Sequence, residues 1–162
     1  MRLVAIAACC AALFSIVAGC RHSHDHESLY AARSDAEKSG EFYRGWLPDF
    51  LPKSSHAIHL AYDLSPSREW CSFEFVPADA EILLNSVRPV DPHAPPIPQI
   101  PSPRVQWWPK FLEGDLDAQL IQQVGQAGFA LYSVTRPLNQ VENETLLFAI
   151  DRKNGRGYFY GH

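Results

Sequence analysis

The stretch that decides the fold runs from His56 to Val76 and reads HAIHLAYDLSPSREWCSFEFV. Apolar side chains alternate with polar or small ones from His56 to Leu64, and again from Glu69 to Val76. An alternation of period two is the pattern of a half-buried strand. Between the two runs lies Ser65-Pro66-Ser67, whose residue types favour a turn. The stretch therefore predicts a β-hairpin with a loop of three or four residues.

Three more strands are predicted in the C-terminal part of the chain, at residues 128–135, 144–152 and 156–161. Asn154-Gly155 between the last two is typical of a two-residue type I′ turn, which needs positive φ at both positions. Such a turn would set Lys153 opposite Arg156, a like-charge pair. A longer loop is the alternative.

The helices are predicted mainly from their first turns. Pro77 and the acidic residues after it open a helix whose buried stripe would be Ile82, Leu83 and Val87. Shorter helices are predicted within residues 28–40 and 116–123. Residues 44–52 contain two prolines four apart and predict a buried, irregular segment. Residues 89–109 are rich in proline and predict a long loop.

These elements together predict an α+β domain. We expect an antiparallel sheet of about five strands, with one main helix on one face and the long Pro-rich loop beside it. Residues 41–162 would form this single domain, and residues 20–40 would form a polar, His-rich tether with a short helix. Residues 1–19 belong to a different kind of segment.

The N-terminus has the features of a bacterial lipoprotein signal peptide. Arg2 is followed by an uncharged, apolar run of about 16 residues, short of the ~20 that span a bilayer. The run ends in Val17-Ala18-Gly19-Cys20, which resembles the lipobox read by lipoprotein signal peptidase. This resemblance implies cleavage before Cys20 and acylation of its thiol. The alternatives are an uncleaved signal anchor and an ordinary signal peptide cut nearby.

Composition limits the possible partners and cross-links of the mature chain. The removed segment carries one of the 14 cationic residues and none of the 18 acidic ones, so the net charge becomes −5. A mildly acidic chain has no electrostatic basis for binding nucleic acid. Cys71 is the one cysteine left for the folded domain, so no internal disulfide can form. Cys71 shares an apolar strand face with Phe73 and Phe75, and we expect it to be an inert core residue.

Few residues suggest chemistry. His22, His24 and His26 form a metal-binding candidate, because imidazoles two residues apart can chelate Zn or Cu from an extended chain. The more common reading is a solvated tether. Ser54 and His56 could suggest a nucleophile and base, but no Gly-x-Ser-x-Gly turn accompanies them. We predict no catalytic residue and no cofactor.

Trp107 and Trp108 close the Pro-rich loop and are candidates for a binding surface, although core packing is the commoner use of tryptophan. They also belong to a wider likeness. Residues 44–54 read RGWLPDFLPKS, and Trp107-Trp108-Pro109 follows much later. This pattern resembles a family of small uncharacterised bacterial exported proteins and lipoproteins. The resemblance implies a compact exported domain and assigns no activity.

The sequence therefore predicts a non-enzymatic accessory or binding domain, held at the cell envelope by lipid on Cys20, with an envelope protein as its possible partner. Arg21 follows that cysteine where an Asp would resemble an inner-membrane retention signal, so the outer membrane is favoured if the cell has two. The alternative is a periplasmic protein that handles Zn or Cu through its N-terminal histidines.

Overall fold

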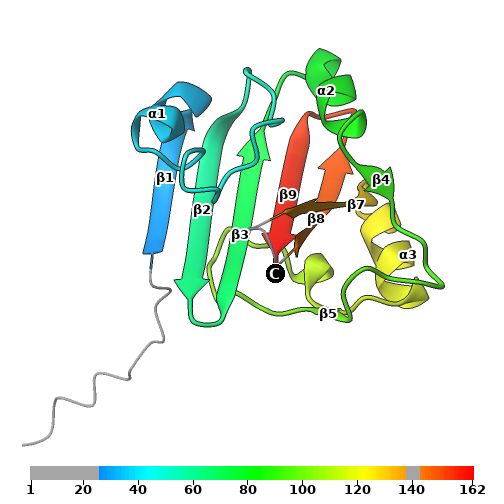
Figure 1. Ribbon diagram of the computed structural model, residues 1–162. Helices are drawn as coiled ribbons and strands as arrows, with labels where there is room; N and C mark the ends of the chain where they lie inside the picture. The colour runs from blue at the N-terminus through cyan, green and yellow to red at the C-terminus, as the bar shows by residue number, and fades with distance from the viewer. Residues whose placement is uncertain (1–25, 138–142) are drawn as a thin grey trace, which may run out of the picture.

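The computed structural model describes residues 26–137 and 143–162, which form a seven-stranded antiparallel sheet in the order β1-β2-β3-β9-β8-β7-β4 (Figure 1). A two-stranded sheet of β5 and β6 lies beside it. The strands are β1 His26–Ala32, β2 His56–Leu64, β3 Ser67–Glu74, β4 Arg88–Pro89, β5 Gln99–Ile100, β6 Gly114–Asp115, β7 Ala130–Pro137, β8 Asn143–Asp151 and β9 Arg156–Gly161.

All five strands predicted from the sequence are confirmed, as β2, β3, β7, β8 and β9. The hairpin turn between β2 and β3 is tighter than expected, because Leu64 pairs directly with Ser67. The turn between β8 and β9 takes the longer form: Asp151 pairs with Arg156, and four residues separate them. Gly155 has a φ of 65° there, and a Cβ on it would clash with a backbone carbonyl.

The predicted fold class is wrong, because the molecule is mostly β and has no long main helix. The expected helix after Pro77 is a 3-10 turn, Pro77–Asp79, followed by the five-residue α2, Ala80–Leu84. Its stripe is incomplete, since Ile82 is 45% exposed. Pro89 disfavours helical geometry in the residue before it. The chain instead enters edge strand β4, so the sheet gains a strand at the point where the helix was expected to end.

The second correction is at the N-terminal edge. Strand β1 occupies residues that we expected in the tether and the first helix, and α1 is limited to Arg33–Lys38. One side of β1 is exposed, so alternate positions such as Glu27 and Leu29 lie on the surface. An edge strand of this kind lacks the apolar pattern that marks the inner strands. Its pairing with β2 shows that residues 26–32 belong to the domain.

One face of the sheet is covered by residues 41–55 together with α1 and α2 (Figure 1). Leu47 and Leu51 are each 1% exposed, which confirms the predicted buried, irregular segment. They pack in one cluster with Cys71 and Phe148 of the sheet. Cys71 is fully buried, and this desolvation raises its pKa well above the ordinary thiol value, as expected for an inert core residue.

The opposite face is covered by the Pro-rich loop, the 3-10 helix Lys110–Leu112 and helix α3, Ala118–Gln126. Successive residues of β8, Leu146 to Ile150, alternate between the two apolar clusters. A strand covered on both faces reads as a continuous apolar run, which explains this part of the sequence. None of the helices in the described ranges is long and apolar enough to cross a membrane.

Candidate functional site

The N-terminal candidates fall partly outside the described residues. Cys20, His22 and His24 lie there, as does the whole signal segment. His26 begins β1, where its Nε2 is 2.5 Å from Ser28 Oγ and 4.0 Å from Glu41 Oε1. Within residues 26–137 and 143–162, no group of three or more His, Cys, Asp or Glu side chains is placed to hold a metal ion.

The two tryptophans of the predicted binding surface have different environments. Trp108 is 4% exposed and packs edge-on against Tyr158 in the core. Trp107 is half-buried, and its indole Nε1 donates to Glu27 at 3.1 Å while its ring lies 5.5 Å from that of His59. Both rings therefore fasten the Pro-rich loop to the sheet.

Ser54 and His56 do not form a nucleophile–base pair. The Ser54 hydroxyl donates to Asp79 at 2.5 Å. The His56 imidazole contacts the Ser54 carbonyl at 3.1 Å through Nδ1 and Glu74 at 3.3 Å through Nε2. The hydroxyl and the imidazole thus serve separate contacts.

Residues 41–46, which we call the strap, are clamped to the first strands by a buried carboxylate. Glu41 is 1% exposed and lies within the covered face of the sheet. Its Oε1 accepts from the Tyr30 hydroxyl at 2.5 Å and from Arg44 at 2.8 Å. Burial is the main cause that raises the pKa of Tyr30, and its hydrogen bond to Glu41 adds to it. Arg44 supplies the charge that a buried carboxylate needs.

The other end of the strap is held by backbone and ring contacts. The Gly45 carbonyl accepts from Arg136 Nη2 at 2.6 Å. The Trp46 ring stacks on Tyr62 with centroids 4.0 Å apart and only 4° between their planes. Phe42 lies under the Arg33 guanidinium at 4.5 Å, a cation–π contact.

Between these fixed residues, Tyr43 is 96% exposed. Its neighbours Phe42 and Arg44 are both engaged in contacts. The sequence therefore builds a rigid turn that holds one aromatic side chain in solvent.

Arg136 also lies between two carboxylates. Its Nε donates to Glu144 at 2.6 Å, and its Nη2 lies 3.2 Å from Glu69. Glu69 is 1% exposed, and its second oxygen has no hydrogen-bond partner among the described residues. Burial raises the pKa of Glu69 well above its ordinary value, the charge on Glu144 raises it further, and Arg136 opposes both. One cation is thus shared by two acids, and its effect on the pKa of Glu69 is smaller than the combined effects of burial and Glu144.

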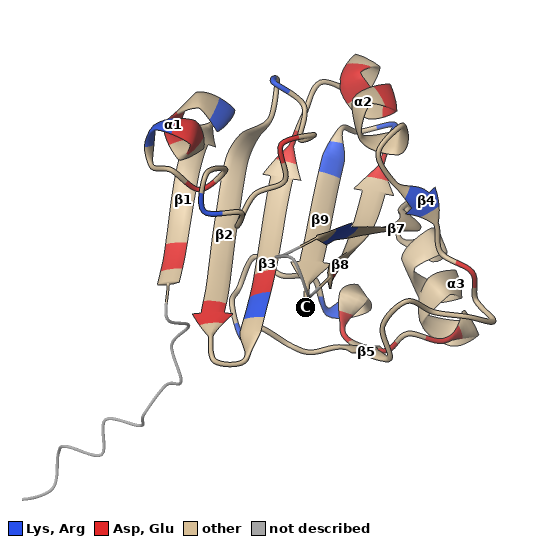
Figure 2. Ribbon diagram, in the orientation of Figure 1, with Lys and Arg blue, Asp and Glu red and all other residues tan. Residues whose placement is uncertain are grey.

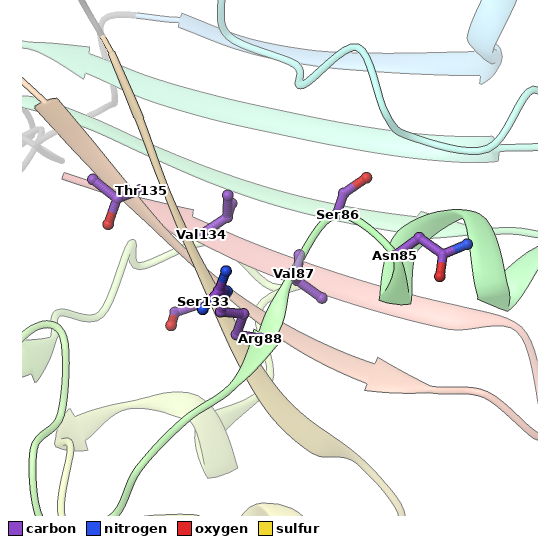
Figure 3. Close-up of a pocket in the computed structure, with 7 residues that line it drawn as sticks. All are labelled: Asn85, Ser86, Val87, Arg88, Ser133, Val134 and Thr135. Atoms are coloured by element: carbon purple, nitrogen blue, oxygen red, sulfur yellow. The ribbon is translucent and has the colours of Figure 1, made fainter.

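A groove of about 500 Å³ opens at the β4 edge of the sheet (Figure 3). It lies between β7 and the stretch that links α2 to β4. Five of its seven lining residues are polar, and none is acidic. The lining comprises Asn85, Ser86, Val87, Arg88, Ser133, Val134 and Thr135.

Sequence reasoning missed the strap contacts, the shared arginine and the groove. Arg136 lies 67 residues from Glu69 and 91 from Gly45, so no local pattern connects them. The one available signal was the Arg44-Gly45-Trp46 motif, whose residues all turn out to hold the strap in place.

Comparison with known proteins gives one partial match. A family model described as the YbbD head domain matches residues 25–74, which is less than half of the chain. The matched segment contains β1, β2, β3 and the strap. No curated protein matches the chain, and no solved structure does. The chain is therefore similar to the YbbD head domain over this segment.

Proposed function

We propose that this chain is a lipid-anchored binding domain of the cell envelope that contacts a partner protein through the strap. The observation that carries the proposal is Tyr43, 96% exposed on a turn whose other residues are fixed. Aromatic side chains dominate the energetics of protein interfaces. Holding one in place beforehand lowers the conformational entropy lost on binding.

The proposed anchor places the strap close to the membrane. Six residue steps separate Cys20 from His26, and an extended chain spans at most about 3.6 Å per residue, or roughly 20 Å in all. His26 Nε2 is 4.0 Å from Oε1 of Glu41, the first residue of the strap. A partner that reaches Tyr43 therefore lies at or near the membrane surface. The outer membrane is favoured over the inner one if the cell has two.

The test places a photo-crosslinking amino acid at position 43 in the otherwise native chain, in cells. We expect a discrete protein adduct that excess purified domain suppresses and the same domain carrying Tyr43→Ala does not. The matched control puts the crosslinker at Leu29, which is 64% exposed on the edge strand. The same adducts from both positions, no adduct, or crosslinks to lipid alone would overturn the proposal.

The anchor has a separate test. Cells fed labelled palmitate should label the wild-type chain and not Cys20→Ala, as judged by mass spectrometry. Label retained in the variant would exclude acylation at Cys20, while leaving the crosslinking result unaffected. The two parts of the proposal are therefore distinguishable.

Metal handling is the second candidate, and one contact favours it. His26 Nε2 lies 4.0 Å from Glu41 Oε1, and the second oxygen of Glu41 is buried without a hydrogen-bond partner in the part of the chain that the structure describes. Arg44 opposes a cation at this carboxylate, because its guanidinium is 2.8 Å from Oε1. Calorimetric titration of the mature chain with Zn and Cu would decide. Stoichiometric binding that is lost when His22, His24 and His26 are replaced by Gln, and kept in His56→Gln, supports metal handling.

A further inference from the structure

The groove at the β4 edge exists because two paired segments diverge. Arg88 pairs with Ser133, and the Val90 N–H donates to the Leu131 carbonyl at 3.1 Å. On the N-terminal side of Arg88 the chain turns away towards α2. Within residues 26–137 and 143–162, no other strand pairs with β7 on this side, and the groove lies between the two segments. Figure 3 shows Arg88 beside Ser133, with Thr135 further along the same strand.

The backbone of β7 adds a donor to this space. In an antiparallel strand, the N–H and C=O groups of one residue point to the same side, and those of the next residue point to the opposite side. Residues two apart therefore direct their backbone groups to the same side. The Leu131 carbonyl faces β4, so the peptide groups of Ser133 and Thr135 face the same way. Ser133 lies opposite Arg88, whereas Thr135 lies beyond the end of β4. Its N–H therefore faces the groove.

The side chains of the groove are complementary to a negative charge. Among residues 26–137 and 143–162, no acidic side chain forms an ion pair with Arg88. Its guanidinium is the one charged group in the described lining, and Figure 2 shows the colour of cationic residues at β4. Asn85, Ser133 and Thr135 add neutral donors. The Thr135 hydroxyl also lies 3.5 Å from that of Thr145, where it can act as the acceptor and keep its own proton for a ligand. The Ser86 hydroxyl already donates to the Ile82 carbonyl at 3.3 Å. Only two valines supply apolar surface.

We propose that this groove binds the oxyanion group of a small ligand, a carboxylate or a phosphate. Arg88 supplies the paired N–H donors that match two oxygens of such a group. The hydroxyls of Ser133 and Thr135 and the Thr135 N–H supply the remaining donors. A cationic ligand finds no carboxylate here, and an apolar ligand finds too little surface. The site is separate from the strap and does not depend on the proposed anchor.

The test is an NMR titration of the mature chain carrying Cys20→Ser. Inorganic phosphate and acetate are added separately, with sodium chloride at matched ionic strength as the reference. We expect saturable shifts of the Thr135 and Ser133 amide resonances with at least one of the two anions, and affinity at least tenfold weaker in Arg88→Gln. Binding of phosphate only, or of acetate only, identifies which oxyanion is preferred.

The matched control is Arg104→Gln, which removes another exposed arginine that no acidic side chain pairs with in the described ranges. Thr135→Val provides a second variant that keeps the shape of the strand residue and should also weaken binding. Equal losses in Arg88→Gln and Arg104→Gln, or shifts that follow chloride as well as the anions, would overturn the proposal. So would the absence of saturation with both anions.

Discussion

Glu69→Gln should make the protein more stable at neutral pH, and the gain should grow as the pH rises. The reason is the raised pKa of Glu69, caused first by burial and then by Glu144. Above the ordinary Glu pKa of about 4.3, the unfolded chain loses this proton while the folded protein keeps it. The folded state then binds one proton more, and the free energy of unfolding falls by up to about 1.4 kcal/mol per pH unit. This loss continues until the pH passes the folded-state pKa.

Glutamine has no such proton to lose, so the variant lacks this part of the pH dependence. Urea unfolding at pH 5 to 8, followed by tryptophan fluorescence, measures the difference directly. Glu74→Gln is the matched control, because Glu74 lies on the same strand with its side chain 56% exposed. If Arg136 instead kept Glu69 ionised, Glu69→Gln would be destabilising throughout this range. A destabilised variant, or the same pH dependence of the unfolding free energy in variant and wild type, would refute the reasoning.

Three further predictions concern stability at other points of the sheet. Gly157→Ala should destabilise the protein by about 1–3 kcal/mol in urea unfolding, because a Cβ there would overlap the Phe73 ring. Asp151→Asn should cost stability at pH 7, and this cost should shrink as the pH falls below the ordinary Asp pKa of about 3.9. Burial would raise the pKa of Asp151, but its hydrogen bonds, chiefly to Arg156, lower it overall, so its contribution is lost as the pH falls through that lowered value. Asp117→Ala should lower the unfolding free energy by about 1 kcal/mol, because the Asp117 side chain accepts a hydrogen bond from the Leu120 N–H in the first turn of α3. Asp117→Asn keeps a side-chain oxygen at this position and should retain most of this stability.

The inner strands were predictable because they lie between other strands and bury apolar side chains in the core. Strands β2 and β3 carry apolar side chains in alternation, and β8 contains a continuous apolar run because both of its faces are covered. Both patterns are visible in the sequence. The two edge strands were not predictable in this way. Strand β1 exposes one side to solvent, and β4 has two residues, one of them Pro89. Their pairing depends on the sheet being already present.

The candidate sites were even less predictable from the sequence, because their residues come from distant parts of the chain. Alternation placed Glu69 at the start of a strand and on the same face as Cys71, but nothing local indicated how a buried carboxyl group would be accommodated there. That burial comes from Arg136, Glu144 and Gly161, which arrive on other strands. The exposure of Tyr43 likewise follows from contacts of its neighbours with distant residues. Such features are properties of the assembled sheet.

The segment that matches the YbbD head domain cannot be a complete structural unit in this protein. It ends at residue 74, the last residue of β3, yet β3 pairs along its length with β9 near the C-terminus. Glu69 within it has Arg136 and Glu144 as charged neighbours, and a side chain at Gly161 would overlap it. Without the C-terminal strands, β3 would expose its backbone edge and this acid would lose the cation that Arg136 provides. The strap is therefore held in position by the whole sheet, because Arg136 bonds Gly45 and the two acids at once.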